Sequence, residues 1–143
     1  RFIEVMPFAD VAEFQQATIV TTREMMERIQ ARLGTLTSAN GGLLDGEAQM
    51  FRLPNARGTV GFISPVSAPF CASCNRVRLT ADGTLRLCLL KDGEVDLKTP
   101  IRRGANAEDL VEILRAAIWR KPWGHDLADG VIPLNRVMSE IGG

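Results

Sequence analysis

The stretch that decides the fold of this chain is CASCNRVRLTADGTLRLC, residues 71–88. Apolar and polar residues alternate on both sides of Ala81-Asp82-Gly83, which is the pattern of two strands joined by a tight turn. A glycine at the third loop position suits a three-residue turn with a bulge, because glycine adopts a positive φ without steric cost. The sequence therefore predicts a β-hairpin whose loop covers residues 81–83.

This loop also predicts the register of the hairpin. Leu79 would face Leu85 and Val77 would face Leu87, so that the apolar pairs share one side. Arg78 would face Arg86, and Arg76 would face Cys88. Because side chains alternate along a strand, the side opposite the apolar pairs would carry cysteines and arginines, namely Cys74, Arg76, Arg78, Arg86 and Cys88. A two-residue turn would set Arg78 opposite Leu87 and mix polar with apolar residues on both faces, which disfavours it.

The predicted face of cysteines and arginines has a chemical consequence. Like charges directly across an antiparallel pair repel each other unless an anion neutralises them. The guanidinium fork matches phosphate oxygens in pairs, and three thiolates (Cys71, Cys74 and Cys88) can hold an iron–sulfur cluster that leaves one iron open. The hairpin therefore predicts a phosphorylated ligand whose other end reaches a metal.

Other interpretations of these residues stay open. A C-x-x-C pair is also common in structural zinc sites, where His125, the only histidine, or an acid would supply the fourth ligand. His125 lies 37 residues beyond Cys88 without a neighbouring Cys or His, unlike most such sites. Alternating arginines are often simply a solvated face, and a third alternative is a hairpin with free thiols and no metal.

Composition and charge narrow the classes of protein. At 143 residues with 45% apolar residues, the chain can bury one ordinary core, so one compact domain is the default. Seventeen basic residues balance seventeen acidic ones, so no overall field attracts nucleic acid or a membrane surface, and any anion site must be local. With no run of about 18 apolar residues and no signal peptide at the start, we expect a cytoplasmic protein whose three cysteines serve metal or redox chemistry. Because the chain opens on an apolar run without Met, we also expect a fragment.

Before the hairpin, the pattern predicts a strand, a helix and a strand pair. Phe2–Met6 suits a buried strand that stops at Pro7, and Val11–Phe14 suits a turn of helix. Thr21 and Glu24 have the spacing of a capping box, which begins a helix that Gly34 ends, with one apolar face: Met25, Met26, Ile29 and Leu33. The ranges Gln49–Leu53 and Thr59–Ile63 predict an antiparallel pair around a turn at 54–58.

After the hairpin, Asn106 is a candidate N-cap for a helix over Ala107–Arg120, which ends before Pro122 and would cover a sheet. Its apolar stripe is Leu110, Ile113, Leu114, Ala117 and Ile118. The tail Trp123–Gly143 shows no period and predicts a loop or extended arm. These elements indicate an α+β chain with antiparallel hairpins and two amphipathic helices, without internal repeats.

Four stretches of sequence carry a resemblance to a known family. They are the hairpin at 71–88, RFIEVMP at 1–7, GFISP at 61–65 and the ending IGG at 141–143. Together they resemble the carboxyl-terminal part of the molybdenum cofactor biosynthesis protein A family, over nearly the whole chain. The resemblance implies a radical S-adenosylmethionine enzyme, a lyase that converts GTP to (8S)-3′,8-cyclo-7,8-dihydroguanosine 5′-triphosphate (GTP 3′,8-cyclase) in molybdopterin biosynthesis.

The resemblance also implies roles for individual residues. Cys71, Cys74 and Cys88 would hold the second of two [4Fe–4S] clusters, whose free iron binds the guanine of GTP. The GTP site would be lined by Arg76, Val77 and Arg78, with the arginines meeting the triphosphate. Met6 would lie at the S-adenosylmethionine site, and Gly142-Gly143 would reach the active site as a mobile tail.

One departure from the family is the C-x-x-x-C-x-x-C motif of the first cluster, which these 143 residues do not contain. The resemblance therefore implies an α/β chain in which residues 1–20 end a TIM-like radical barrel, and 21–143 form the cluster- and GTP-binding domain. Alone, this chain is predicted not to cleave S-adenosylmethionine or turn over GTP. The implied partner is GTP, and a homodimer is the candidate assembly. Cyclic pyranopterin monophosphate synthase would act on the product. We expect this chain to bind neither nucleic acid nor a membrane.

Overall fold

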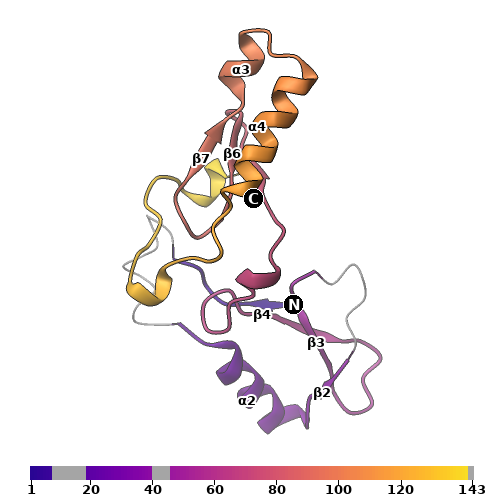
Figure 1. Ribbon diagram of the computed structural model, residues 1–143. Coiled ribbons are helices and arrows are strands. Elements are labelled where there is room, and N and C mark those ends of the chain that lie inside the picture. Colours follow the sequence, from indigo (N-terminus) through magenta and orange to yellow (C-terminus); the bar gives the residue numbers. More distant parts are fainter. Residues whose placement is uncertain (8–18, 40–45, 142–143) are drawn as a thin grey trace. The chain divides into compact units, whose positions relative to one another are not determined.

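The computed structural model describes residues 1–7, 19–39 and 46–141 (Figure 1). These residues form two compact units. The first comprises 1–6, 19–39 and 46–70, and the second comprises Pro7 and 71–141. The predicted helical turn at Val11–Phe14 and the Gly142-Gly143 tail lie outside the described residues. The predicted boundary between a barrel end at 1–20 and a domain at 21–143 stays a prediction.

The first unit is built on a four-stranded sheet in the order β1-β4-β3-β2. The strands are β1 (Phe2–Ile3), β2 (Thr37–Ser38), β3 (Gln49–Arg52) and β4 (Val60–Ile63). β3 and β4 are antiparallel, which confirms the predicted pair, whereas β1 runs parallel to β4. The sequence did not predict β2, which is only two residues long.

The prediction of a buried strand over Phe2–Met6 is wrong in length and in burial. Only Phe2 and Ile3 form the strand, and Phe2, Ile3 and Val5 are 45%, 51% and 51% exposed. The reason is that β1 is an edge strand, with a partner on one side only among the described residues. Burial falls instead on polar Glu4, which is 1% exposed and extends the pairing by donating its N–H to Ile63 O at 3.1 Å.

Helix α2 (Thr22–Leu33) follows its predicted limits. The Thr21 hydroxyl accepts a hydrogen bond from Glu24 N at 3.3 Å, and Gly34 ends the helix with φ +98°. The predicted apolar face is only partly covered, because Leu33 at its end is 63% exposed. The caps at Thr21 and Gly34 therefore define the limits of this helix better than the burial of its apolar face does.

The second unit contains a three-stranded antiparallel sheet in the order β5-β6-β7. Its strands are β5 (Arg78–Leu79), β6 (Thr84–Arg86) and β7 (Glu94–Asp96), and its helices are α3 (Lys98–Arg102) and α4 (Ala107–Trp119). Three short 3₁₀ turns cover Cys71–Ser73, Leu127–Asp129 and Met138–Glu140, the last two inside the predicted irregular tail. The sequence did not predict β7 or α3.

Helix α4 begins at the predicted cap. Asn106 Oδ1 accepts hydrogen bonds from the N–H groups of Glu108 at 2.8 Å and Asp109 at 3.0 Å, while Asp109 Oδ2 accepts one from Asn106 N at 2.9 Å. This is a complete capping box, which satisfies donors that the first helical turn otherwise leaves unpaired.

The core of the second unit confirms that α4 covers a sheet. Ala117 of α4 lies in one buried cluster with Leu85, Leu87 and Leu97, and Figure 1 shows α4 running beside β6 and β7. Ile118 was predicted to belong to the same apolar stripe but is 57% exposed. It lies one residue beyond Ala117, which turns its side chain by about 100° around the helix.

The described part of the chain is therefore a mixed α/β fold, as predicted, while its origin in a barrel stays a prediction. Within the described ranges, every helix is too short or too polar to cross a lipid bilayer.

Candidate functional site

The cysteine hairpin has the predicted register. β5 and β6 pair Arg78 with Arg86 and Leu79 with Leu85. Thr80 N donates to Thr84 O at 2.9 Å, and Gly83 N to Thr80 O at 3.0 Å, which closes the three-residue loop with Gly83 at φ +85°. A loop of this type places the two strands in register without further contacts.

The ladder is shorter than predicted. It ends at the Arg78–Arg86 pair, so the predicted pairs Val77–Leu87 and Arg76–Cys88 do not belong to it. The apolar side is also unevenly covered, because Leu85 is 4% exposed while Leu79 is 62% exposed. Helix α4 covers β6, whereas β5 is the edge of the sheet.

The three cysteines lie at the two ends of the hairpin's arms. Cys71 begins a 3₁₀ turn, and Cys74 N donates to Cys71 O at 3.1 Å, so one turn carries both residues. Cys88 follows the end of β6 by two residues, and all three thiols are partly buried and free of disulfides. The Gly124 backbone lies against Cys71, since a methyl group at Gly124 would stand 3.7 Å from Cys71 Sγ.

The positions of possible metal ligands leave the ligand set untested. Among the described residues, no three Cys, His, Asp or Glu side chains lie close enough together to hold a metal ion. Neither the predicted trio of cysteines nor the alternative zinc set that adds His125 is therefore assembled among these residues. His125 Nδ1 accepts a hydrogen bond from Leu127 N at 3.4 Å. The assignment of Cys71, Cys74 and Cys88 as ligands stays a prediction.

Arg78 lies near two of the cysteines and two other arginines. Its side chain is half-buried, and no described residue forms a hydrogen bond or ion pair with it. Burial lowers the pKa of Arg78, and the like charge of Arg76 lowers it further. Cys74 and Cys88 act in the opposite direction on this pKa, so both sulfur groups lie near the guanidinium. The structure thus brings together two predicted ligands and two predicted anion-binding residues.

Arg86 differs from this prediction, because its charge is neutralised inside the protein. It is 1% exposed, with Nη1 lying 3.1 Å from Glu94 Oε1 and Nη2 lying 3.4 Å from Asp92 Oδ1 and 3.2 Å from Leu89 O. The Arg78–Arg86 pair therefore does not require a bound anion for Arg86. Of the pair, only Arg78 lacks a carboxylate partner among the described residues.

A residue from the tail, Arg136, completes the network around Arg86, and sequence analysis missed it. Its Nε and Nη2 donate to the two oxygens of Glu94 at 2.6 and 2.9 Å, and Nη2 also donates to Asp82 Oδ2 at 2.8 Å. These hydrogen bonds lower the pKa of Glu94, and the Thr80 hydroxyl followed by Arg136 lowers the pKa of Asp82. Nothing in the local sequence signals a contact between residues so far apart.

The first unit contains Met6, the predicted S-adenosylmethionine residue, just after β1. Met6 is partly buried. Two residues earlier, buried Glu4 accepts hydrogen bonds from the N–H groups of Thr22 at 2.8 Å, Ser67 at 2.9 Å and Val66 at 3.2 Å. Burial by itself would raise the pKa of Glu4, yet a hydrogen bond from the Ser67 hydroxyl, together with these backbone hydrogen bonds, lowers the pKa on balance. Glu4 therefore organises this end of the sheet, and the role of Met6 stays a prediction.

Comparison with known proteins agrees with the resemblance of the hairpin. The model of the family Molybdenum Cofactor Synthesis C matches residues 1–127. A protein named GTP 3′,8-cyclase from Desulforamulus reducens is 43% identical over 143 residues, which are 100% of this chain and 44% of that protein. Proteins of the same name from Moorella thermoacetica and Gloeobacter violaceus are 45% and 48% identical, covering 100% and 85% of this chain and 43% and 37% of their own lengths.

The chain spans less than half the length of these relatives. The family match covers most of the chain, including the hairpin with its cysteines and arginines. The chain therefore belongs to the Molybdenum Cofactor Synthesis C family and corresponds to the carboxyl-terminal part of molybdenum cofactor biosynthesis protein A.

Proposed function

We propose that this chain is the portion of a GTP 3′,8-cyclase that binds the second [4Fe–4S] cluster and the substrate GTP. The relatives carry the name of that enzyme, and the chain aligns with them over its whole length. In the complete enzyme, GTP is converted to (8S)-3′,8-cyclo-7,8-dihydroguanosine 5′-triphosphate for molybdenum cofactor biosynthesis. Because residues 1–143 do not contain C-x-x-x-C-x-x-C, this chain by itself is proposed to bind GTP without turning it over.

The observation that carries the proposal is the environment of Arg78. A half-buried guanidinium without a carboxylate partner among the described residues needs a counter-anion, and a phosphate group suits its fork of donors. Arg76 adds a second positive charge beside it. We assign Arg76 and Arg78 to the triphosphate, with Val77 between them lining the same site.

The donor set fits an iron–sulfur cluster in its chemistry. Three free thiols, two on one turn and one after β6, are the donor type that holds an iron–sulfur cluster with one iron lacking a protein ligand. When bound, such a cluster supplies an iron that accepts a Lewis-basic atom of the substrate. Cys71, Cys74 and Cys88 would hold it beside the arginines, so the base and the phosphates of GTP are fixed from opposite ends.

The remaining parts of the proposal concern the rest of the enzyme. S-adenosylmethionine and the first [4Fe–4S] cluster would bind in the portion that this chain lacks, with Met6 at the S-adenosylmethionine site. The proposed setting is cytoplasmic, with a homodimer as the candidate assembly. Cyclic pyranopterin monophosphate synthase would act on the product.

Metal analysis tests the proposed cluster. After anaerobic reconstitution with iron and sulfide, we expect about four irons per chain. A variant with Cys71, Cys74 and Cys88 changed to Ser should bind none, whereas His125→Ala should bind as the wild type does. Retention of one zinc that depends on His125 would instead establish the zinc-stabilised module, and thiols that bind neither metal would exclude both sites.

A further inference from the structure

Arg136 joins the carboxyl-terminal segment to the cysteine hairpin. Its side chain is 16% exposed, and it contacts Asp82 in the hairpin loop and Glu94 in β7. The two-point contact with Glu94 is the bidentate geometry that makes arginine–carboxylate pairs strong and orientationally specific. One guanidinium thus links a segment with no strand or α-helix of its own to two parts of the sheet.

A second contact holds the same segment. Leu134 N donates to Asp92 Oδ2 at 3.4 Å, while Asp92 Oδ1 faces Arg86. The tail therefore contacts both carboxylates that neutralise Arg86. Segment and hairpin share one set of charges, so a change on one side affects the other.

These charges form a row across the sheet. The strand register places Arg78 beside Arg86 and Arg86 beside Glu94. Glu94 makes one hydrogen bond to Arg86 and two to Arg136, so Arg136 provides most of what holds this carboxylate in place. If Glu94 moved away, the buried charge of Arg86 would act directly on its neighbour Arg78.

We propose that Arg136 is a positioning residue. By binding Glu94 and Asp82, Arg136 acts as a clamp that fixes the segment around residues 134–141 on the hairpin and keeps the charge of Arg86 neutralised. Arg76 and Arg78 alone then receive the anionic ligand. The part that concerns the ligand rests on the proposed binding of GTP. The part that concerns the clamp rests on the contacts among described residues and stands separately.

Hydrogen–deuterium exchange and GTP titration of the full chain test the two parts. In Arg136→Met, we expect the backbone amides of residues 131–141 to exchange about tenfold faster or more, while amides of β6 stay within about twofold. Arg136→Lys should fall between wild type and Met, because lysine keeps the charge and loses the fork. This milder variant also keeps the test available if the Met variant does not fold.

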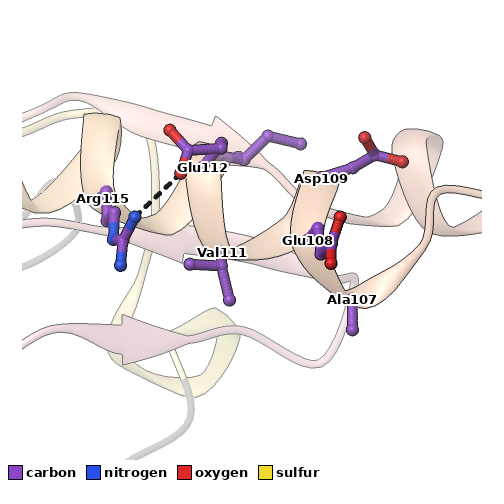
Figure 2. Close-up of a pocket in the computed structure, with 7 residues that line it drawn as sticks. Ala107, Glu108, Asp109, Val111, Glu112 and Arg115 are labelled. Atoms are coloured by element: carbon purple, nitrogen blue, oxygen red, sulfur yellow. Dashed lines mark hydrogen bonds and ion pairs between the residues drawn. The ribbon is translucent and has the colours of Figure 1, made fainter.

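Arg115 offers a matched control. Figure 2 shows it on α4 among the residues that line a pocket, joined to Glu112. The distance from Arg115 Nη1 to Glu112 Oε1 is 2.9 Å, and 73% of the Arg115 side chain is exposed. Arg115→Met removes an arginine–carboxylate pair from the same unit without touching the hairpin. We expect neither exchange at 131–141 nor GTP affinity to change in this variant.

The outcomes separate the clamp from the ligand site. Unchanged exchange at 131–141 in Arg136→Met, or a Lys variant no better than Met, overturns the clamp. If Arg136 has the positioning role, the Arg136→Met variant should bind GTP about threefold more weakly or worse than the wild type. Faster amide exchange at 131–141 together with an unchanged dissociation constant for GTP overturns this role. A wild-type chain that binds no GTP would defeat the proposed function, and the exchange result would still decide whether the clamp exists.

Discussion

Arg78 and Arg86 show how one residue type at paired positions acquires two different roles. Arg86 is paired with Glu94 and Asp92, whereas Arg78 has no carboxylate partner among the described residues and lies near Cys74 and Cys88. A buried guanidinium with carboxylate partners contributes to structure, while a half-buried one without them is suited to bind a ligand.

Replacing Arg78 tests this difference. Arg78→Ala should weaken GTP binding by about 1 to 3 kcal/mol, the range for a lost charge-assisted contact, as measured by calorimetric titration. Arg23→Ala is the control, because the Arg23 side chain is 88% exposed and pairs with Glu27 on the surface of α2. Equal GTP affinity in the wild type and in Arg78→Ala would show that Arg78 does not belong to the GTP site.

Sequence patterns predicted the neighbours of Arg78 but not the fate of Arg86. Alternation placed both arginines on one face, and the register confirms that they are opposite each other. The alternation could not show that Glu94, eight residues later, pairs with Arg86 from the next strand, or that Arg136 approaches from the tail. Such contacts depend on tertiary packing, for which the residues carry no local signature.

Loops and caps were predictable because they depend on neighbouring residues. Gly83 at φ +85° is an example, since the hairpin loop requires a residue in the left-handed conformation at this position. Leu97 N and Lys98 N both donate to Gly83 O at 3.0 Å, so the loop also anchors the start of α3.

Adding a side chain at this glycine should destabilise the second unit. In Gly83→Ala the new methyl group would lie 2.8 Å from Lys98 Cβ, in a backbone conformation that alanine adopts poorly. We expect a loss of about 1 to 3 kcal/mol in urea unfolding. Gly58→Ala is the control, because nothing lies within 4 Å of its added carbon, and a similar loss in both variants would contradict the role of the loop.

Short elements escaped prediction for a physical reason. β7 and β2 have three and two residues, which are too few for a period of two to appear in the sequence. Edge position likewise decided the exposure of Phe2 and Ile3, which their apolar character could not reveal. The longer helix α4 was predictable because its cap and stripe lie within one window.

The stability of the chain should fall in acid. The pKa values of four carboxyl groups are lowered in the folded protein: Glu4, Asp82, Glu94 and Asp96. A group whose pKa is depressed by folding stabilises the fold above its ordinary value, here 3.8 for Asp and 4.5 for Glu, and loses this contribution as the pH falls through the folded value. The urea midpoint should therefore decrease as the pH is lowered from about 5 to about 3.

Glu4→Gln should flatten part of this dependence, because Glu4 is buried and its carboxylate accepts three backbone N–H groups. Glu27→Gln, on the exposed surface of α2, should leave it unchanged. A urea midpoint that stays constant between pH 5 and 3 in the wild type would show that these carboxylates are not coupled to folding.

The cluster of Arg86 and Arg136 with Asp82, Asp92 and Glu94 has a further consequence for how a nucleotide meets the protein. Three carboxylates against two guanidiniums leave this cluster slightly negative, close to the two arginines of the anion site, in a chain of zero formal charge. The net negative charge of this cluster offsets part of the positive charge of Arg76 and Arg78, so an approaching polyphosphate feels only a weak attraction before it reaches Arg78. The association rate of a nucleotide should thus change little with ionic strength, and the site would discriminate among anions through their dissociation rates.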